Sequence, residues 1–176
     1  MRVQASALYY HFADKQELLD GMAAAVVGPM PSPDAPFPGP EGWRELLRAI
    51  GQGMRTAMLS RRDGVRLILS ARPAASQREF LDRLVSFLVG AGFTPHEGAV
   101  AFFTISNYVQ GCALEAQQED RWREAKDPHP DLDAYPTLRD AGLSPFDDEL
   151  FAAGLDLILD ALQMTLQTRN LERNRS

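Results

Sequence analysis

The sequence has a single cysteine, Cys112, among 176 residues, and only three histidines. One cysteine cannot form an internal disulfide, and the histidines share no spacing typical of a metal site. No apolar run reaches the ~18 residues of a membrane span, and no signal peptide is present. We therefore expect a cytoplasmic protein that has no membrane segment and needs no cofactor.

The sequence also lacks an excess of positive charge: 18 lysines and arginines stand against 24 acidic residues, which gives a formal net charge of −6. Contact with nucleic-acid phosphates normally requires a basic surface, so a DNA-binding function would have to rest on a motif. The first eighteen residues are neutral overall, with Arg2 and Lys15 against Asp14 and Glu17. With 45% apolar residues, the chain can still build a sizeable core.

Strand-like alternation is missing, and the apolar residues recur at helical spacing, so we expect an all-α fold. No serine is marked as a nucleophile and no phosphate-binding glycine loop follows a strand, so we do not expect an enzyme. Prolines are concentrated in residues 28–42, which hold six of them. This segment divides the chain into residues 1–27, a linker over 28–42, and residues 43–176.

Five helices are predicted from periodicity and capping patterns. They span residues 14–27, 43–61, 76–90, 96–125 and 147–168, with a short segment at 63–70 and an irregular loop over 126–145. The predicted capping boxes pair Asp14 with Glu17, Ser76 with Glu79, and Thr94 with Glu97. Gly51 and Gly53 weaken the second helix, so close packing or a ligand could require the bare backbone there.

The helices over 96–125 and 147–168 are apolar on more than one face. A helix that is apolar all round must be buried all round. We therefore expect a homodimer in which these two helices bury their second stripes against the partner.

The first residues are predicted to form a short helix that ends in a break before the helix starting at Asp14. Small side chains begin the first helix and polar rings end it, which suits a helix whose start meets DNA base edges. The candidate DNA contacts are Gln4, Ala5, Ser6, Ala7, Tyr9, Tyr10, His11 and Lys15. The segment resembles the recognition helix of TetR-family repressors through Val3, Leu8, Tyr9, His11, Phe12, Lys15, Leu18 and Leu19.

From Trp43 onward the chain also resembles the tetracycline-repressor branch of that family. The residues on which this resemblance rests include Arg62-Asp63-Gly64, Ala71-Arg72-Pro73, Gly92-Phe93, Gly111-Cys112 and Gly154-Leu155. The resemblance implies a homodimer with a four-helix bundle, operator DNA, and repression relieved by a small-molecule effector. The family's DNA-binding domain has two further helices before the recognition helix, so the chain starting at Met1 is expected to bind DNA weakly. The alternative is a ligand-binding dimer without autonomous DNA binding.

The resemblance also implies a pocket between the helices that open near Trp43, Ser76 and His96. Its expected lining is Ile50, Met54, Ile68, Leu84, Phe87, Phe103, Asn107 and Glu115. Ile68 aligns with a metal-ligating histidine of the tetracycline repressor, and Ile50 and Leu84 align with polar drug contacts. We therefore expect an apolar or aromatic effector that binds without a metal. Asn107 and Glu115 could instead be solvated, but an unpaired buried amide costs about 1–3 kcal/mol, which favours a pocket role for Asn107.

Overall fold

The computed structural model describes residues 14–27, 36–72, 74–125, 134–141 and 148–173, and no strand occurs among them. The elements are α2 (Lys15–Val27), the 3-10 turn η1 (Pro40–Gly42), α3 (Trp43–Leu59), α4 (Gly64–Ser70), α5 (Ala75–Gly90), α6 (Pro95–Ala125), α7 (Pro136–Asp140) and α8 (Asp148–Arg173). The all-α prediction is confirmed. None of the described helices is both long enough and apolar enough to cross a membrane.

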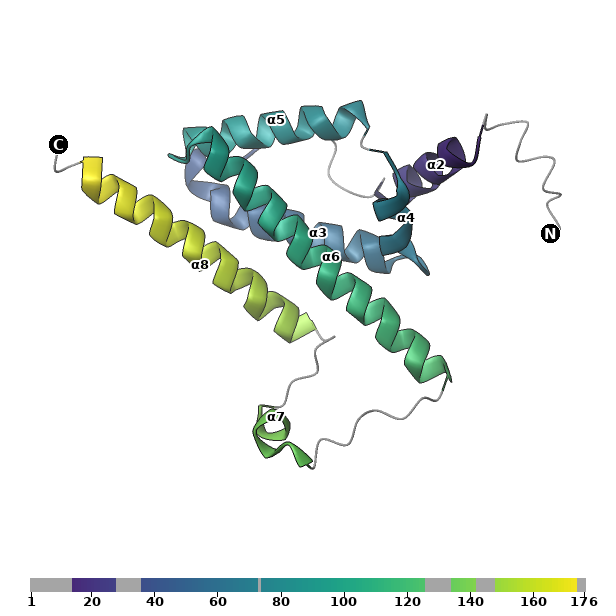
Figure 1. Ribbon diagram of the computed structural model, residues 1–176. Coiled ribbons are helices and arrows are strands. Elements are labelled where there is room, and N and C mark those ends of the chain that lie inside the picture. The colour runs from purple at the N-terminus through teal and green to yellow at the C-terminus, as the bar shows by residue number, and fades with distance from the viewer. Residues whose placement is uncertain (1–13, 28–35, 73, 126–133, 142–147, 174–176) are drawn as a thin grey trace.

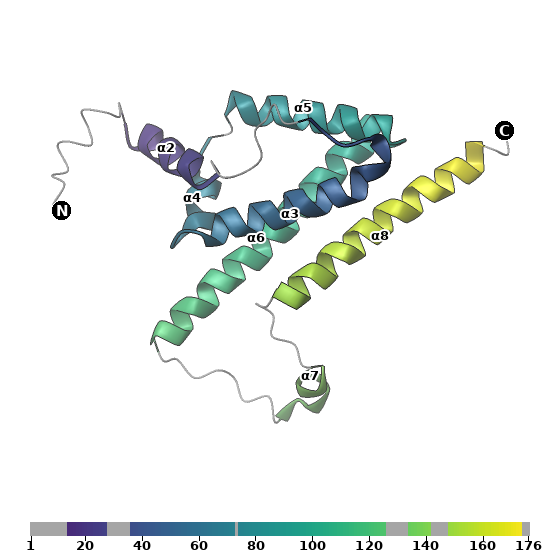
Figure 2. The same ribbon diagram turned by 180° about the vertical axis from the view of Figure 1, so that it is seen from behind.

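The two longest helices, α6 and α8, run side by side in opposite directions, and α3 packs against both of them (Figure 1). Seen from behind, α5 lies across the first half of α6, and α2 and α4 sit together near one end of α3 (Figure 2). The body of the protein is therefore built around α3 and α6. The elements α2, α4 and α5 surround one side of this pair.

The core lies where α3, α6 and α8 meet. Its fully buried members include Leu47, Met58, Ile105, Val109, Leu155 and Leu159. A Cβ atom added at Gly51 would lie 3.1 Å from Leu155 Cδ2 and 3.4 Å from Ile105 Cγ2, whereas Gly53 has open space around it. Of the two predicted reasons for glycine in α3, close packing therefore applies at Gly51.

Of the three predicted capping boxes, the one at Thr94 is complete and the one at Asp14 shows the bond from the helix to the capping side chain. The Glu17 backbone N–H donates to Asp14 Oδ1 at 2.8 Å. Thr94 and Glu97 exchange both bonds, from the Thr94 N–H to Glu97 Oε2 at 2.8 Å and from the Glu97 N–H to Thr94 Oγ1 at 3.2 Å.

The prediction at Ser76 and Glu79 is wrong. The helix begins one residue earlier, at Ala75, and the Ala74 N–H donates to the Gln77 side chain at 3.2 Å. Gln77 serves as well as a glutamate at this position because its carbonyl oxygen accepts the same bond.

Other boundaries differ from the prediction. The predicted loop over 126–145 contains the short helix α7, and α8 continues to Arg173. Helix α3 ends at Leu59, before the predicted Arg61, and Asp63 then adopts a left-handed conformation with φ 58°. The Gln117 amide donates to the carbonyls of Met58 (3.0 Å) and Arg61 (2.9 Å), so a side chain of α6 satisfies the free carbonyls at this helix end.

The predicted linker contributes to the packing from residue 36 onward. Phe37 lies with its ring 5.2 Å from that of Phe87 and 6.2 Å from that of Phe80, both on α5. Residues 1–13, which include seven of the eight candidate DNA contacts, lie outside the described part of the chain. Lys15 is described, and it is exposed at the start of α2.

Candidate ligand-binding site

A cavity of about 980 Å³ lies among α2, α3, α4, α5 and α6. Its apolar lining comes from several elements and includes Ala23, Met54, Met58, Ile68, Phe80, Leu81, Phe102 and Phe103. Its polar lining is Asp20, Arg72, Ser76, Gln77, Arg78, Ser106, Asn107 and Gln110. A largely apolar cavity of this size with a few polar groups is typical of a small-molecule site.

Helical periodicity explains how α6 supplies one wall of the cavity. Phe102, Phe103, Ser106, Asn107 and Gln110 follow one another at spacings of one, three, one and three residues. Side chains three and four residues apart share a helix face, so this run forms one continuous strip. The neighbouring face, which carries Ile105 and Val109, is buried in the core, and this holds the strip in place.

Ser106 carries the least satisfied polar group of the cavity. The residue is only 5% exposed, and its Oγ atom has no hydrogen-bond partner in the described part of the chain. Leaving a buried hydroxyl unpaired costs about 1–3 kcal/mol. A ligand that donates to or accepts from this hydroxyl would recover that free energy.

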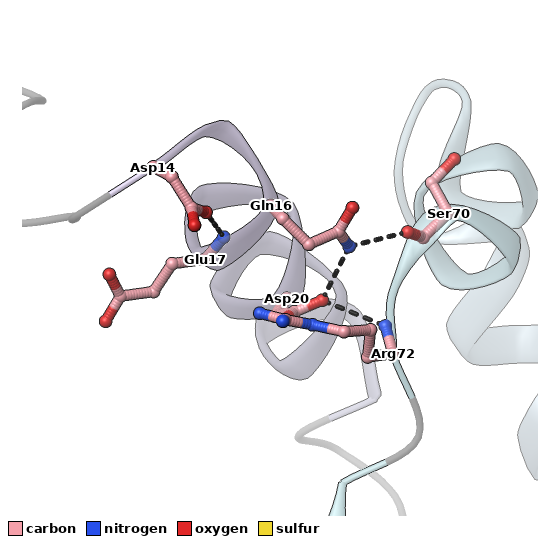
Figure 3. Close-up of polar contacts among 6 residues, drawn as sticks. All are labelled: Asp14, Gln16, Glu17, Asp20, Ser70 and Arg72. Atoms are coloured by element: carbon pink, nitrogen blue, oxygen red, sulfur yellow. Dashed lines mark hydrogen bonds and ion pairs between the residues drawn. The ribbon is translucent and has the colours of Figure 1, made fainter.

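The rim of the cavity includes an ion pair between α2 and the residue two positions beyond α4 (Figure 3). The Arg72 backbone N–H donates to Asp20 Oδ1 at 2.9 Å, while its Nε and Nη2 donate to Asp20 Oδ2 at 3.0 and 2.8 Å. Gln16 donates both to Asp20 Oδ1 and to the Ser70 carbonyl, each at 2.9 Å. We call this set of four residues the rim latch.

The Asp20–Arg72 ion pair of the rim latch is charged at neutral pH. The Arg72 backbone N–H, the Gln16 amide and the Arg72 guanidinium together lower the pKa of Asp20 to about 2. Asp20 in turn raises the pKa of Arg72. One charged pair thus ties α2 to the chain segment that follows α4, directly beside the cavity.

Four of the predicted ligand contacts lie together in the cavity lining, namely Met54, Ile68, Phe103 and Asn107. The other four lie elsewhere. Ile50 and Leu84 are buried in the core, Phe87 packs against Phe37, and Glu115 is exposed outside the lining.

Asn107 is exposed in the single chain, so it does not hold the buried unpaired amide that was predicted. The buried polar group without a partner is instead the hydroxyl of its neighbour Ser106, a residue that was not predicted from the sequence. A serine within an apolar helical run was the available signal. The latch residues could not have been found this way, since Asp20 and Arg72 are 52 residues apart and meet only through the fold.

The described residues offer little to a metal ion. No group of three or more histidine, cysteine, aspartate or glutamate side chains that could hold one occurs among them. The cavity lining includes one carboxylate, Asp20, which is already paired with Arg72. Ile68 presents only hydrocarbon to the cavity and so supplies no ligand to a metal ion.

Comparisons with known proteins agree with the fold. Residues 35–166 match the family described as Tetracyclin repressor-like, C-terminal domain. The chain is similar to the Tetracycline repressor protein class A from transposon 1721 of Escherichia coli, with 34% identity over 97% of this chain and 81% of that protein.

Two solved structures share the arrangement of helices. One is a possible TetR family transcriptional regulator from Streptomyces coelicolor A3(2), with a TM-score of 0.72, 30% identity, and coverage of 93% of this chain and 84% of that chain. The other is TetR(class A) in complex with 5a,6-anhydrotetracycline and magnesium, with a TM-score of 0.68, 33% identity, and coverage of 90% of this chain and 80% of that chain.

Proposed function

The chain belongs to the TetR family of ligand-responsive transcriptional repressors, and from that premise we propose that its effector is a small, largely apolar or aromatic molecule bound without a metal. The protein is a regulator and not an enzyme. The observation that carries the proposal is the cavity among α2–α6, whose body is apolar and whose buried Ser106 hydroxyl lacks a partner.

The lining supports a metal-free effector. A magnesium chelate needs oxygen or nitrogen ligands, and at Ile68 the cavity has a hydrocarbon side chain in the position that the resemblance assigns to a ligating histidine. Ile50 and Leu84, the other two replacements, are buried in the core and make the region more apolar. An apolar body with one or two hydrogen-bonding groups fits this lining best.

The rim latch supports a way for ligand binding in the cavity to change the position of α2. Asp20 lines the cavity and belongs to α2, and Arg72 lines it just beyond α4. A ligand that shifts either side chain changes how α2 is held against α4. We propose that α2 carries the DNA-reading segment, and that its displacement alters the spacing of the two segments in a dimer, which must match half-sites about 34 Å or a multiple apart.

The dimer itself is part of the proposal. Large apolar side chains remain exposed on the two longest helices of the single chain, namely Val100, Phe103 and Trp122 on α6, and Leu157, Met164 and Leu171 on α8. Burying such side chains against a second copy removes apolar surface from water. We propose a homodimer through α6 and α8.

The test is a thermal-shift screen of small apolar and aromatic molecules in magnesium buffer and in EDTA, with magnesium–tetracycline as the comparison probe. A ligand at a hundredfold excess over its Kd stabilises the folded state by about 2.7 kcal/mol. We expect hits that are equally effective in EDTA. Stabilisation by tetracycline that requires magnesium and vanishes in EDTA would overturn the metal-free proposal.

A matched pair of variants assigns the hits to the cavity. Ile68→Asp places a charge in the lining, whereas Leu69→Asp places it on the exposed neighbour. We expect the first variant to lose the stabilisation and the second to retain it. The sequence predicts weak DNA binding, so the protein is first tested for selection of a DNA duplex from a random pool, and each hit is then tested for release of a selected duplex. Binding without release would refute the repressor mechanism.

A further inference from the structure

Charge is distributed unevenly around the cavity. Its lining contains one carboxylate, Asp20, and two guanidinium groups, Arg72 and Arg78. Asp20 and Arg72 neutralise each other in the rim latch. Arg78 has no ion-pair partner among the described residues, so one positive charge at the cavity is left unbalanced.

The start of α5 adds to this positive character. Ser76, Gln77 and Arg78 all line the cavity from the first turn of the helix, and that turn contains no acidic residue. Unpaired backbone N–H groups at a helix N-terminus favour an anion. The buried, unpartnered hydroxyl of Ser106 is an independent sign that the same cavity receives a polar ligand group.

We propose that the effector is an anionic amphiphile whose acid group binds Arg78 and the start of α5 and weakens the Asp20–Arg72 pair. Its apolar or aromatic body lies among the methionine and phenylalanine side chains of the lining, and a hydrogen-bonding group reaches Ser106. This inference rests on the proposed function, since it names the chemical class of the effector for the same cavity.

The geometry of the rim latch explains how an anion would loosen it. Arg72 uses Nε and Nη2 for Asp20, which leaves further guanidinium donors free. The Arg72 side chain is 66% exposed and that of Asp20 is 27% exposed, so the arginine can turn toward a new partner at little cost in desolvation. A bound anion would share Arg72 and repel the Asp20 carboxylate, and both effects reduce the hold on α2.

A cationic ligand fits this arrangement less well. The only carboxylate of the lining is occupied by Arg72, and Arg78 would repel a second positive charge. A neutral ligand could fill the apolar body but would leave Arg78 and the start of α5 unmatched. The lining therefore favours an anion over both alternatives.

Two fluorescent probes with the same ring system test the proposal. These are 8-anilinonaphthalene-1-sulfonate, which is an anion, and N-phenyl-1-naphthylamine, which lacks the sulfonate and is neutral. Binding is measured by fluorescence titration of the full chain. We expect the anion to bind at least about tenfold more tightly, a difference of about 1.4 kcal/mol.

Three variants locate that preference. Arg78→Gln should remove most of the preference for the anion, because it weakens binding of the anionic probe only. Arg66→Gln changes an exposed arginine outside the lining and should leave the preference unchanged. Ile68→Asp should weaken both probes. Equal affinity of the wild type for the two probes would overturn the anionic class while leaving the proposed function standing. Failure of both probes to bind, or their indifference to Ile68→Asp, would overturn the proposed function as well.

Hydrogen exchange tests the effect on the rim latch. We expect the anionic probe to speed amide exchange in residues 15–27, and the neutral probe at equal occupancy to leave it unchanged. The exchange of α8 serves as the internal reference. An anion preference without faster exchange in α2 would overturn the competition for Arg72.

Discussion

Arg169, close to the end of α8, donates both to the Glu97 carboxylate and, at 3.2 Å, to the Gly92 carbonyl just before α6. Glu97 at the same time accepts the Thr94 N–H that begins α6. The Arg169 guanidinium, together with that N–H, lowers the pKa of Glu97 from 4.5 to about 2. One carboxylate therefore caps α6 and joins it to α8.

This arrangement predicts a pH-dependent contribution to stability. The folded-state pKa of Glu97 is depressed, so its contribution is complete above the unfolded value of 4.5 and is lost as the pH falls toward about 2. We expect Glu97→Gln to lower the free energy of unfolding by about 1 kcal/mol at pH 6, with the gap narrowing below pH 4.5 and closing only near pH 2. Urea unfolding across this range measures it, and a gap that stays constant would contradict the assigned pKa.

Gly53 in α3 and Gly64 at the start of α4 should respond in opposite ways to substitution by alanine. A Cβ atom at Gly64 would overlap the Met58 backbone carbonyl, which cannot move without disturbing the end of α3. Gly64→Ala should therefore destabilise the fold by about 1–3 kcal/mol. At Gly53, with open space around it, alanine should stabilise by about 0.5–1 kcal/mol. Denaturant midpoints of the two variants check the pair, and a loss at both sites would contradict it.

Ser106→Ala should separate stability from ligand binding. Removal of an unpartnered buried hydroxyl relieves its desolvation cost, so the unliganded protein should gain about 1 kcal/mol. The same change should weaken effector binding, because the ligand loses its polar partner. Thermal melts with and without a confirmed ligand measure both quantities. Lower stability without ligand would show that the hydroxyl is satisfied after all.

The dimer should depend on the apolar face of α8. Leu157 is 71% exposed in the single chain, and a charge there would be buried in the proposed interface. We expect Leu157→Glu to give monomers at micromolar concentration where the wild type is a dimer. Ala152→Glu, on an exposed residue about 140° further round the helix, should remain dimeric. Analytical ultracentrifugation decides, and a monomeric wild type would remove the idea.

Much of the fold could be predicted because the local signals are strong. The caps at Asp14 and Thr94 place the starts of α2 and α6 correctly. The start of α5 was misplaced because Ser76 and Glu79 offer an equally good pattern two residues away from the pair actually used, Ala74 and Gln77. Capping patterns constrain a helix start to within a residue or two, and the tertiary contacts decide between neighbouring choices.

The cavity was harder to predict from the chain alone. Alignment with a family brought Met54 and Ile68 to the lining, but it also suggested Leu84, which this chain buries completely. An apolar side chain gains free energy by burial, so alignment alone did not show that Leu84 belongs to the core of this chain. The rim latch depends on two residues on separate elements, and no local pattern links them.

The close packing of Leu155 and Ile105 against Gly51 bears on which helices can move when a ligand binds. With Leu155 and Ile105 only 3.1 and 3.4 Å from an added Cβ, α3 packs tightly against α6 and α8 at this point. A dense apolar contact of this kind resists gradual deformation. By contrast, exposed polar bonds hold α2 to the chain just beyond α4, and such bonds break and re-form more readily. We therefore expect a ligand that enlarges the cavity to displace α2 and to leave α3 in place.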